Sequence, residues 1–161
     1  MAVNGQLVHG MGHPEFGHIL ISRVAGDDYK GKCPFHGSCL ESLASGPAIE
    51  ERWGGKPVDL SEKPEVWEIE ADYIAQGLMA MVLTISPRKI ILGGGVMHQL
   101  QLFPLIRTKL LEKLAGYIHT KELEDIDEYV VPASLDDDQG ILGALQLGVL
   151  ANIESINNGR D

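Results

Sequence analysis

A short segment with three potential metal ligands places the strongest constraint on how this chain can fold. It runs from Cys33 to Cys39 with His36 between them, so that a ligand recurs every three residues. Zinc prefers thiolate and imidazole ligands, and structural zinc sites take four of them in a tetrahedron. A loop this short supplies three ligands, so the fourth must come from another part of the chain.

Three upstream histidines are candidates for the fourth ligand. His18 is the natural choice, although spacing alone leaves His9 and His13 open as rivals. Two cysteines with two histidines would form a closed structural site that has no open position for water. The alternative is a pair of free cysteines with an incidental histidine between them. The cluster favours metal ligands over a disulfide in a chain expected to be cytoplasmic.

Two carboxylates flank these candidate ligands. Glu15 lies three residues before His18, and Glu41 lies two residues after Cys39. If a metal ties the two segments together, both carboxylates come close to it, and carboxylates accept paired hydrogen bonds from sugar hydroxyls. The alternative is that each is a solvated charge, with Glu41 the first-turn acid of the helix that follows.

Charge and hydropathy exclude several classes of function. The 161 residues include 23 acidic and 13 basic side chains, a net charge of −10, which opposes binding to a nucleic-acid backbone. No apolar run approaches the ~20 residues of a membrane span. The first residues show neither a basic region nor a hydrophobic stretch, so no signal peptide is visible and a cytoplasmic location is expected.

Hydrophobic periodicity predicts alternating strands and helices, which is typical of an α/β lobe. Short strands are expected as a hairpin over 3–8 with an Asn4-Gly5 turn, and over 19–21, 89–92 and 129–132. Helices are expected over 41–53 with an interruption at Gly46-Pro47, and over 64–85, 103–115 and 140–153. The last helix is expected to pack through small residues, namely Gly143, Ala144 and Gly148.

Two further runs have both a functional and a purely structural interpretation. Gly93, Gly94 and Gly95 follow a predicted strand and would let the backbone approach a nucleotide, but a tight turn explains them as well. They match neither the P-loop nor the dinucleotide fingerprint. The acidic run 136–138 could bind a divalent cation, and we interpret it instead as the cap of the following helix.

Together these segments resemble the ROK family of sugar kinases and repressors, in particular its bacterial fructokinase branch. The resemblance covers nearly the whole chain, and the Cys33–Cys39 loop is its most specific element. It is carried by residues 13–18, 33–41, 43–49, 91–97 and 140–144. It implies an actin-like, ribonuclease H-like α/β fold, with residues 1–161 as the C-terminal lobe.

Within that lobe, the resemblance implies a zinc-binding segment at about 13–41 and a nucleotide-side α/β part at about 64–153. It implies that zinc is held by His18, Cys33, His36 and Cys39. It implies that the hexose is bound by Glu15, His18 and Glu41. It implies that the nucleotide is bordered by Pro47, Gly94, Gly95, Val96, Met97, His98 and Gln99.

The chain also departs from the family pattern. The Asp-Gly-Gly-Thr phosphate loop, the catalytic aspartate in an Asn-Asp-Ala-like setting and the second Gly-Thr-Gly loop have no counterpart here. We therefore expect the N-terminal lobe to be absent, no catalytic residue in this chain, and no activity from the chain alone.

The intact enzyme is expected to be a homodimer that transfers phosphate from Mg-ATP to a hexose, with fructose at its 6-hydroxyl favoured. The alternatives are a glucose or mannose kinase of the same family, and a non-catalytic zinc-stabilised module for sugar binding or dimerisation.

Overall fold

The computed structural model describes residues 1–135 and 138–158, with side chains described as far as residue 153. Its strands are β1 (Ala2–Val3), β2 (Gln6–Leu7), β3 (Ile90–Leu92) and β4 (Val130–Pro132). Its α-helices are α1 (Leu40–Ala44), α2 (Gly46–Trp53), α3 (Pro64–Ile85), α4 (Leu102–Leu114), α5 (Lys121–Glu124), α6 (Ile126–Tyr129) and α7 (Gln139–Asn158). Its 3₁₀ helices are η1 (Phe16–His18), η2 (Pro57–Leu60) and η3 (Gly95–His98).

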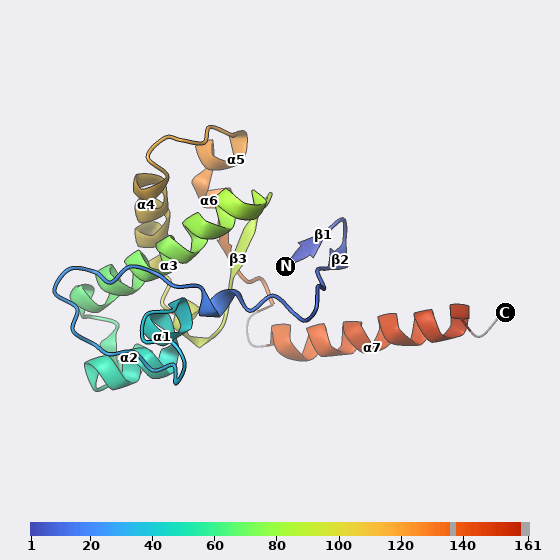
Figure 1. The fold of residues 1–161 in the computed structure, drawn as a ribbon, viewed down its shortest axis with the longest axis horizontal. Coiled ribbons are helices and arrows are strands. Elements are labelled where there is room, and N and C mark those ends of the chain that lie inside the picture. The colour runs from blue at the N-terminus through green and yellow to red at the C-terminus, as the bar shows by residue number, and fades with distance from the viewer. Residues whose placement is uncertain (136–137, 159–161) are drawn as a thin grey trace.

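Helices α3 and α4 enclose the hydrophobic core (Figure 1). Helix α3 has Pro64 in its first turn and ends at Ser86, whose left-handed backbone (φ 42°) precedes Pro87. Trp67 anchors the core, because it is 1% exposed and its indole N–H donates to Leu60 O at 3.0 Å. The fully buried apolar side chains around it include Val66, Ala71, Leu102, Ile106 and Leu110.

Strands β3 and β4 form a parallel pair, with Ile90 opposite Val130 and Leu92 opposite Pro132. Parallel strands need a long crossover connection, and here it contains α4, α5 and α6. Arg107 on α4 fastens the crossover, because its Nε donates to Val130 O at 3.0 Å. The carboxyl ends of both strands therefore open on the same edge, where the glycine run begins.

Most of the predicted elements are confirmed, including the hairpin, the interruption between α1 and α2, and helix α3 over its whole length. The predicted strand over 19–21 is wrong. That segment forms a single bridge, Leu20 to Cys39, with Ile21 N donating to Ser38 O and Leu40 N donating to Ile19 O. The partner segment turns into α1 after Cys39, so the ladder cannot continue.

The C-terminal helix α7 forms as predicted, but its expected packing is wrong. It extends away from the helical body (Figure 1), and Gly143, Ala144 and Gly148 are exposed. Its apolar side chains are exposed as well, Ile141 at 66% and Leu145 at 62% among them. Within the described part of the chain, no helix is long and apolar enough to cross a membrane. The acidic run at 136–138 lies mostly outside the described residues.

Candidate metal centre and substrate-facing residues

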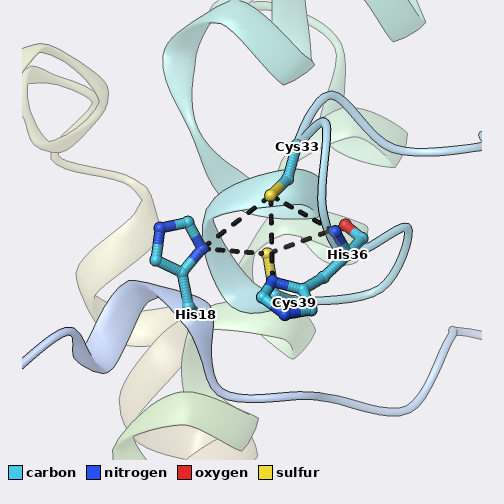
Figure 2. Close-up of side chains that lie close together, drawn as sticks. All are labelled: His18, Cys33, His36 and Cys39. Carbon is cyan, nitrogen blue, oxygen red and sulfur yellow. Dashed lines mark hydrogen bonds between the residues drawn. The ribbon is translucent and has the colours of Figure 1, made fainter.

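Four side chains converge at the junction between η1 and the loop that precedes α1 (Figure 2). His18 comes from the last position of η1, and Cys33, His36 and Cys39 come from the loop. One ligand atom from each of these four residues lies within 4.8 Å of the other three. The structure therefore brings the four predicted ligands together.

The spacing of these atoms suits a tetrahedral metal. His18 Nδ1 lies 3.8 Å from Cys33 Sγ and 3.7 Å from Cys39 Sγ, and His36 Nδ1 lies 3.9 Å from Cys33 Sγ. Zinc bonds of about 2.0–2.3 Å to nitrogen and sulfur place tetrahedral ligands about 3.3–3.8 Å apart. The four donors could thus hold a tetrahedral metal ion, and their separations, up to 4.8 Å, are somewhat wider than those of a bound zinc site.

The rival histidines lie outside this cluster. His9 and His13 are exposed and pack against each other, with ring centroids 4.5 Å apart. In contrast, the end of η1 is held against the loop, because Leu40 N donates to Ile19 O at 3.0 Å and Ile21 N donates to Ser38 O at 2.9 Å. The open choice among three histidines therefore resolves to His18.

The His18 ring also reaches one of the flanking carboxylates. Its Nδ1 faces the two sulfurs, while Nε2 lies 3.4 Å from Glu41 Oε2. A carboxylate on the second nitrogen of a metal-ligating histidine fixes the tautomer and the ring orientation. Glu15 is exposed at the other end of η1.

The two thiols differ in their surroundings. Backbone N–H groups of Phe35 and His36 point at Cys33 Sγ, each at 3.4 Å, and they lower the pKa of that thiol. Burial raises the pKa of Cys39, which is 0% exposed. A bound cation would favour the thiolate at both positions, since metal binding requires deprotonated cysteine.

A strap of polar contacts holds the segment between His18 and Cys33 on α3. Ser22 N donates to Gln76 Oε1 at 2.8 Å, and Gln76 Nε2 donates back to Ser22 O at 2.9 Å. One turn earlier on α3, Tyr73 OH accepts from Val24 N at 3.1 Å and also bonds the Asp27 carboxylate. Gln76 and Tyr73 lie three residues apart on one face of the helix.

A buried ionic group completes this strap. Arg52 on α2 donates to Asp27 Oδ2 at 2.6 Å and to Glu70 Oε1 at 2.8 Å. Burial raises the pKa of Glu70 to about 8, and the Arg52 guanidinium offsets this only in part. A pKa of about 8 favours the protonated form of Glu70 near neutral pH. Nothing in the sequence pattern marks this triad as a unit.

The glycine run borders a second candidate site. A cavity of about 240 Å³ opens at the carboxyl ends of β3 and β4, where open α/β sheets bind their ligands. Of the predicted nucleotide residues, Gly94, Met97 and His98 line it. Gly93 of the predicted glycine run lines it as well, and the other lining residues were not assigned to the nucleotide from the sequence: Leu92, Leu100, Pro132, Ala133 and Gln139.

The remaining predicted nucleotide residues lie beside the cavity rather than in its wall. Gln99 is 8% exposed and accepts from Gln101 Nε2 at 2.9 Å. Pro47 is the second residue of α2, after Gly46, and a Cβ at Gly46 would stand 3.7 Å from Val96 Cγ2. Gly95 begins η3 after Gly94, whose φ of 94° suits glycine. The structure thus places α2 and η3 next to each other.

Comparison with known proteins agrees with these features. The family model for the ROK family matches residues 1–149. A Bacillus subtilis (strain 168) protein provisionally named a fructokinase is 51% identical over 146 residues, which are 90% of this chain and 49% of that protein. A Pediococcus pentosaceus protein named fructokinase is 45% identical over 145 residues, 90% of this chain and 49% of that protein.

A solved structure supports the fold. The crystal structure of a ROK hexokinase from Thermus thermophilus superimposes with a TM-score of 0.69 at 22% identity, covering 88% of this chain and 50% of that one. The chain spans about half the length of the curated relatives it matches. The alternating α/β architecture, the parallel β3–β4 pair and the sequence match agree, and the chain belongs to the ROK family.

Proposed function

We propose that this chain forms the metal-bearing C-terminal lobe of an ATP-dependent fructokinase. In that enzyme the γ-phosphoryl group of Mg-ATP passes to the 6-hydroxyl of fructose. The supporting comparisons are the ROK family match and the relatives named fructokinase. The observation that carries the proposal is the double use of His18, which faces two sulfurs through Nδ1 and Glu41 through Nε2.

In this proposal the metal has a structural role. His18, Cys33, His36 and Cys39 would hold zinc, and a four-ligand site leaves no open position for a substrate. The ion would fix η1 to the start of α1, so that Glu15, His18 and Glu41 face the sugar together. Carboxylates are suited to this task, because they accept hydrogen bonds from neighbouring hydroxyl groups.

The proposed nucleotide side is the edge formed by β3, β4 and η3. Pro47 and residues 94–99 would border ATP there, with the cavity residues Gly93 and Gln139 beside them. Magnesium would enter with the nucleotide. We further propose that the chain is divided by task, with metal and sugar binding at about 13–41 and nucleotide binding at about 64–153. We also propose that the enzyme is a cytoplasmic homodimer.

The catalytic base belongs, in this proposal, to a second lobe that these 161 residues do not contain. Phosphoryl transfer depends on positioning and on electrostatic stabilisation of the transferring group. Losing a general base costs about 10²–10⁴-fold in rate, and losing the phosphate loops should add to that. The exposed apolar face of α7 fits a helix that packs against such a lobe.

The test joins the amino-terminal half of the Bacillus subtilis relative to this chain and measures ADP release with fructose, glucose and mannose. We expect turnover with fructose from the chimera and none from the chain alone. Preference for glucose or mannose would replace the proposed sugar. Sugar binding without turnover in the chimera would favour the non-catalytic module. Turnover by the lone chain within tenfold of the relative would refute the two-lobe proposal.

Variants of the chimera separate sugar binding from metal binding. Glu41→Ala should raise the KM for fructose and leave the zinc content unchanged, with the exposed Glu65→Ala as matched control. Cys39→Ser should remove the metal and destabilise the lobe, because metal-binding energy is also folding energy. If Glu41→Ala removes zinc and leaves the KM for fructose unchanged, Glu41 orients His18 and does not bind the sugar.

A further inference from the structure

The loop that carries Cys33, His36 and Cys39 has few regular backbone hydrogen bonds. Its first arm, which precedes Cys33, and its second arm, which follows His36, nevertheless meet at one point. The carbonyl oxygen of Gly37, directly after the ligand His36, accepts from Arg23 Nη2 at 2.7 Å and from Ser42 Oγ at 3.4 Å. Ser42 is 0% exposed, so it approaches from the interior, while Arg23 approaches from the exposed side. The loop is therefore clamped from both sides.

Arg23 reaches both arms of the loop. One guanidinium nitrogen, Nη2, donates to Gly37 O in the second arm and to Lys30 O at 3.1 Å in the first. The other nitrogen, Nη1, donates to Tyr29 O. A guanidinium has a rigid fork of donors, so a single side chain can hold several carbonyls at fixed spacing. Arg23 thus bridges the residues before Cys33 to the residue after His36.

Gly31 shows how closely the two arms approach. Its φ is +95°, and a Cβ there would stand 2.2 Å from Ser42 Oγ and 2.3 Å from Gly37 O. Ser42 Oγ also accepts from Cys33 N at 3.1 Å. The same small region therefore contains the inner clamp, the first cysteine and the carbonyl that Arg23 holds. All of these contacts are between protein atoms, so none of them requires a bound metal.

We propose that Arg23 is a positioning residue that holds the ligand loop in its metal-binding shape before the metal arrives. The inference rests on the proposed metal centre. Ordering a flexible loop costs conformational entropy for each residue fixed. A loop that is already ordered spares the metal this cost and binds it more tightly. Without the Arg23 fork, the exposed clamp is gone and the two arms separate in the metal-free protein.

The test compares Arg23→Ala and Arg23→Lys with wild type in the chain as it stands. Arg88→Ala is the matched control, because Arg88 is also exposed and lies on the turn between α3 and β3. Zinc affinity is measured by competition with a chromophoric chelator. The metal-free protein is then treated with a thiol reagent, and labelled peptides are resolved by mass spectrometry to give separate rates for Cys33 and Cys39.

We expect Arg23→Ala to weaken zinc binding about tenfold, at the lower end of the loss seen when groups that support metal ligands are removed. The same opening should speed labelling of buried Cys39, because affinity falls with the fraction of competent loop while labelling rises with the fraction that is open. Arg23→Lys should give intermediate values, because an ammonium keeps the charge but is a compact group that lacks the wide, planar fork of donors. The cobalt absorption spectrum should match wild type in every variant, since the four ligands remain.

The outcomes separate this inference from the metal proposal. If wild type binds neither zinc nor cobalt, the metal centre and the inference both fail. If wild type binds zinc and Arg23→Ala matches it in affinity and in Cys39 labelling, only the role of Arg23 is overturned. Full recovery in Arg23→Lys would also overturn it, because charge rather than the fork would then be responsible.

Discussion

Two regions of the molecule are stabilised by different interactions. One is the α3–α4 layer, formed by those two helices, and the other is the ligand segment, residues 14–42. The layer encloses large apolar side chains, and Trp67, Leu102, Ile106 and Leu110 are each at most 1% exposed. Within the described ligand segment, Cys39 and Ser42 are the buried side chains. The segment is instead held by hydrogen bonds that Arg23 donates and that Gln76 and Tyr73 accept.

This difference predicts two kinds of stability in one chain. Apolar burial is non-directional and roughly proportional to area, so the layer should tolerate small shifts and persist without a ligand. Hydrogen bonds depend on distance and angle, and each contributes only about 0.5–1.5 kcal/mol net. The ligand segment should therefore open locally at a lower free energy than the layer, and a bound metal should close that gap.

The largest expected effect is on the layer. Trp67→Ala removes a buried side chain together with its hydrogen bond to Leu60 O, and should cost about 3–5 kcal/mol of unfolding free energy. Urea unfolding of the zinc-loaded protein measures this cost. The folded variant should still bind about one zinc per chain, because Trp67 contributes no ligand. A folded variant that has lost its zinc would show that the two regions are not separable.

A smaller effect is expected at Glu70, the point where the strap meets α3. Its folded pKa of about 8 lies above the ordinary 4.5, so the folded state holds a proton that the unfolded state has lost. This contribution favours the fold at low pH and declines as pH rises from about 4.5 through about 8. Glu70→Gln keeps the neutral form and should abolish that decline.

The measurement is unfolding free energy against pH for wild type and Glu70→Gln. Other titrating groups are common to both proteins, so the difference between the two curves isolates Glu70. Wild type should lose stability relative to the variant as pH rises through this window. Curves that stay parallel would show that folding leaves the pKa of Glu70 unshifted, and a wild type that gains relative stability would show that folding lowers it.

The smallest expected effect is at the start of α2. Ser45 Oγ accepts from Ala48 N at 3.4 Å, the N-cap bond of that helix. Ser45→Ala should cost about 0.5–1 kcal/mol, because replacing such caps typically costs about 1 kcal/mol and this bond is long. Thermal unfolding measures the loss, and zinc content should not change. A loss above about 2 kcal/mol would mean that α2 supports more than its own end.

The layer was the part most open to prediction from the sequence. The apolar face over 64–85, flanked by Pro64 and Pro87, predicts α3. Apolar residues that recur every 3.6 positions over so long a segment lie on one face only if the segment is an α-helix. The four side chains that converge in the structure were likewise predicted as metal ligands from chemistry and resemblance. For the helix at 140–153 the element was predicted correctly and its packing was not. Its apolar residues fixed the period, but they carry no information about which surface covers them.

The clamp and the strap were not predictable in this way. Arg23 lies ten residues from Cys33, and Arg52 lies eighteen from Glu70, so no local period connects them. Exposed arginines are common, and only the distances to Tyr29, Lys30 and Gly37 carbonyls distinguish Arg23. Side-chain bonds to irregular backbone depend on the loop conformation itself, which Gly31 permits through its positive φ.

Hydrogen exchange with and without zinc tests the difference between the two regions most directly. Amide protection is measured by mass spectrometry for the zinc-loaded chain and for the same chain after chelation. Chelation should lower, without abolishing, the protection of amides in the ligand segment, including those of Ile21, Lys32 and Cys33, because the Arg23 clamp still orders the metal-free loop, and it should leave the centres of α3 and α4 unchanged. Equal loss of protection in both regions, or no loss in the ligand segment, would contradict the account.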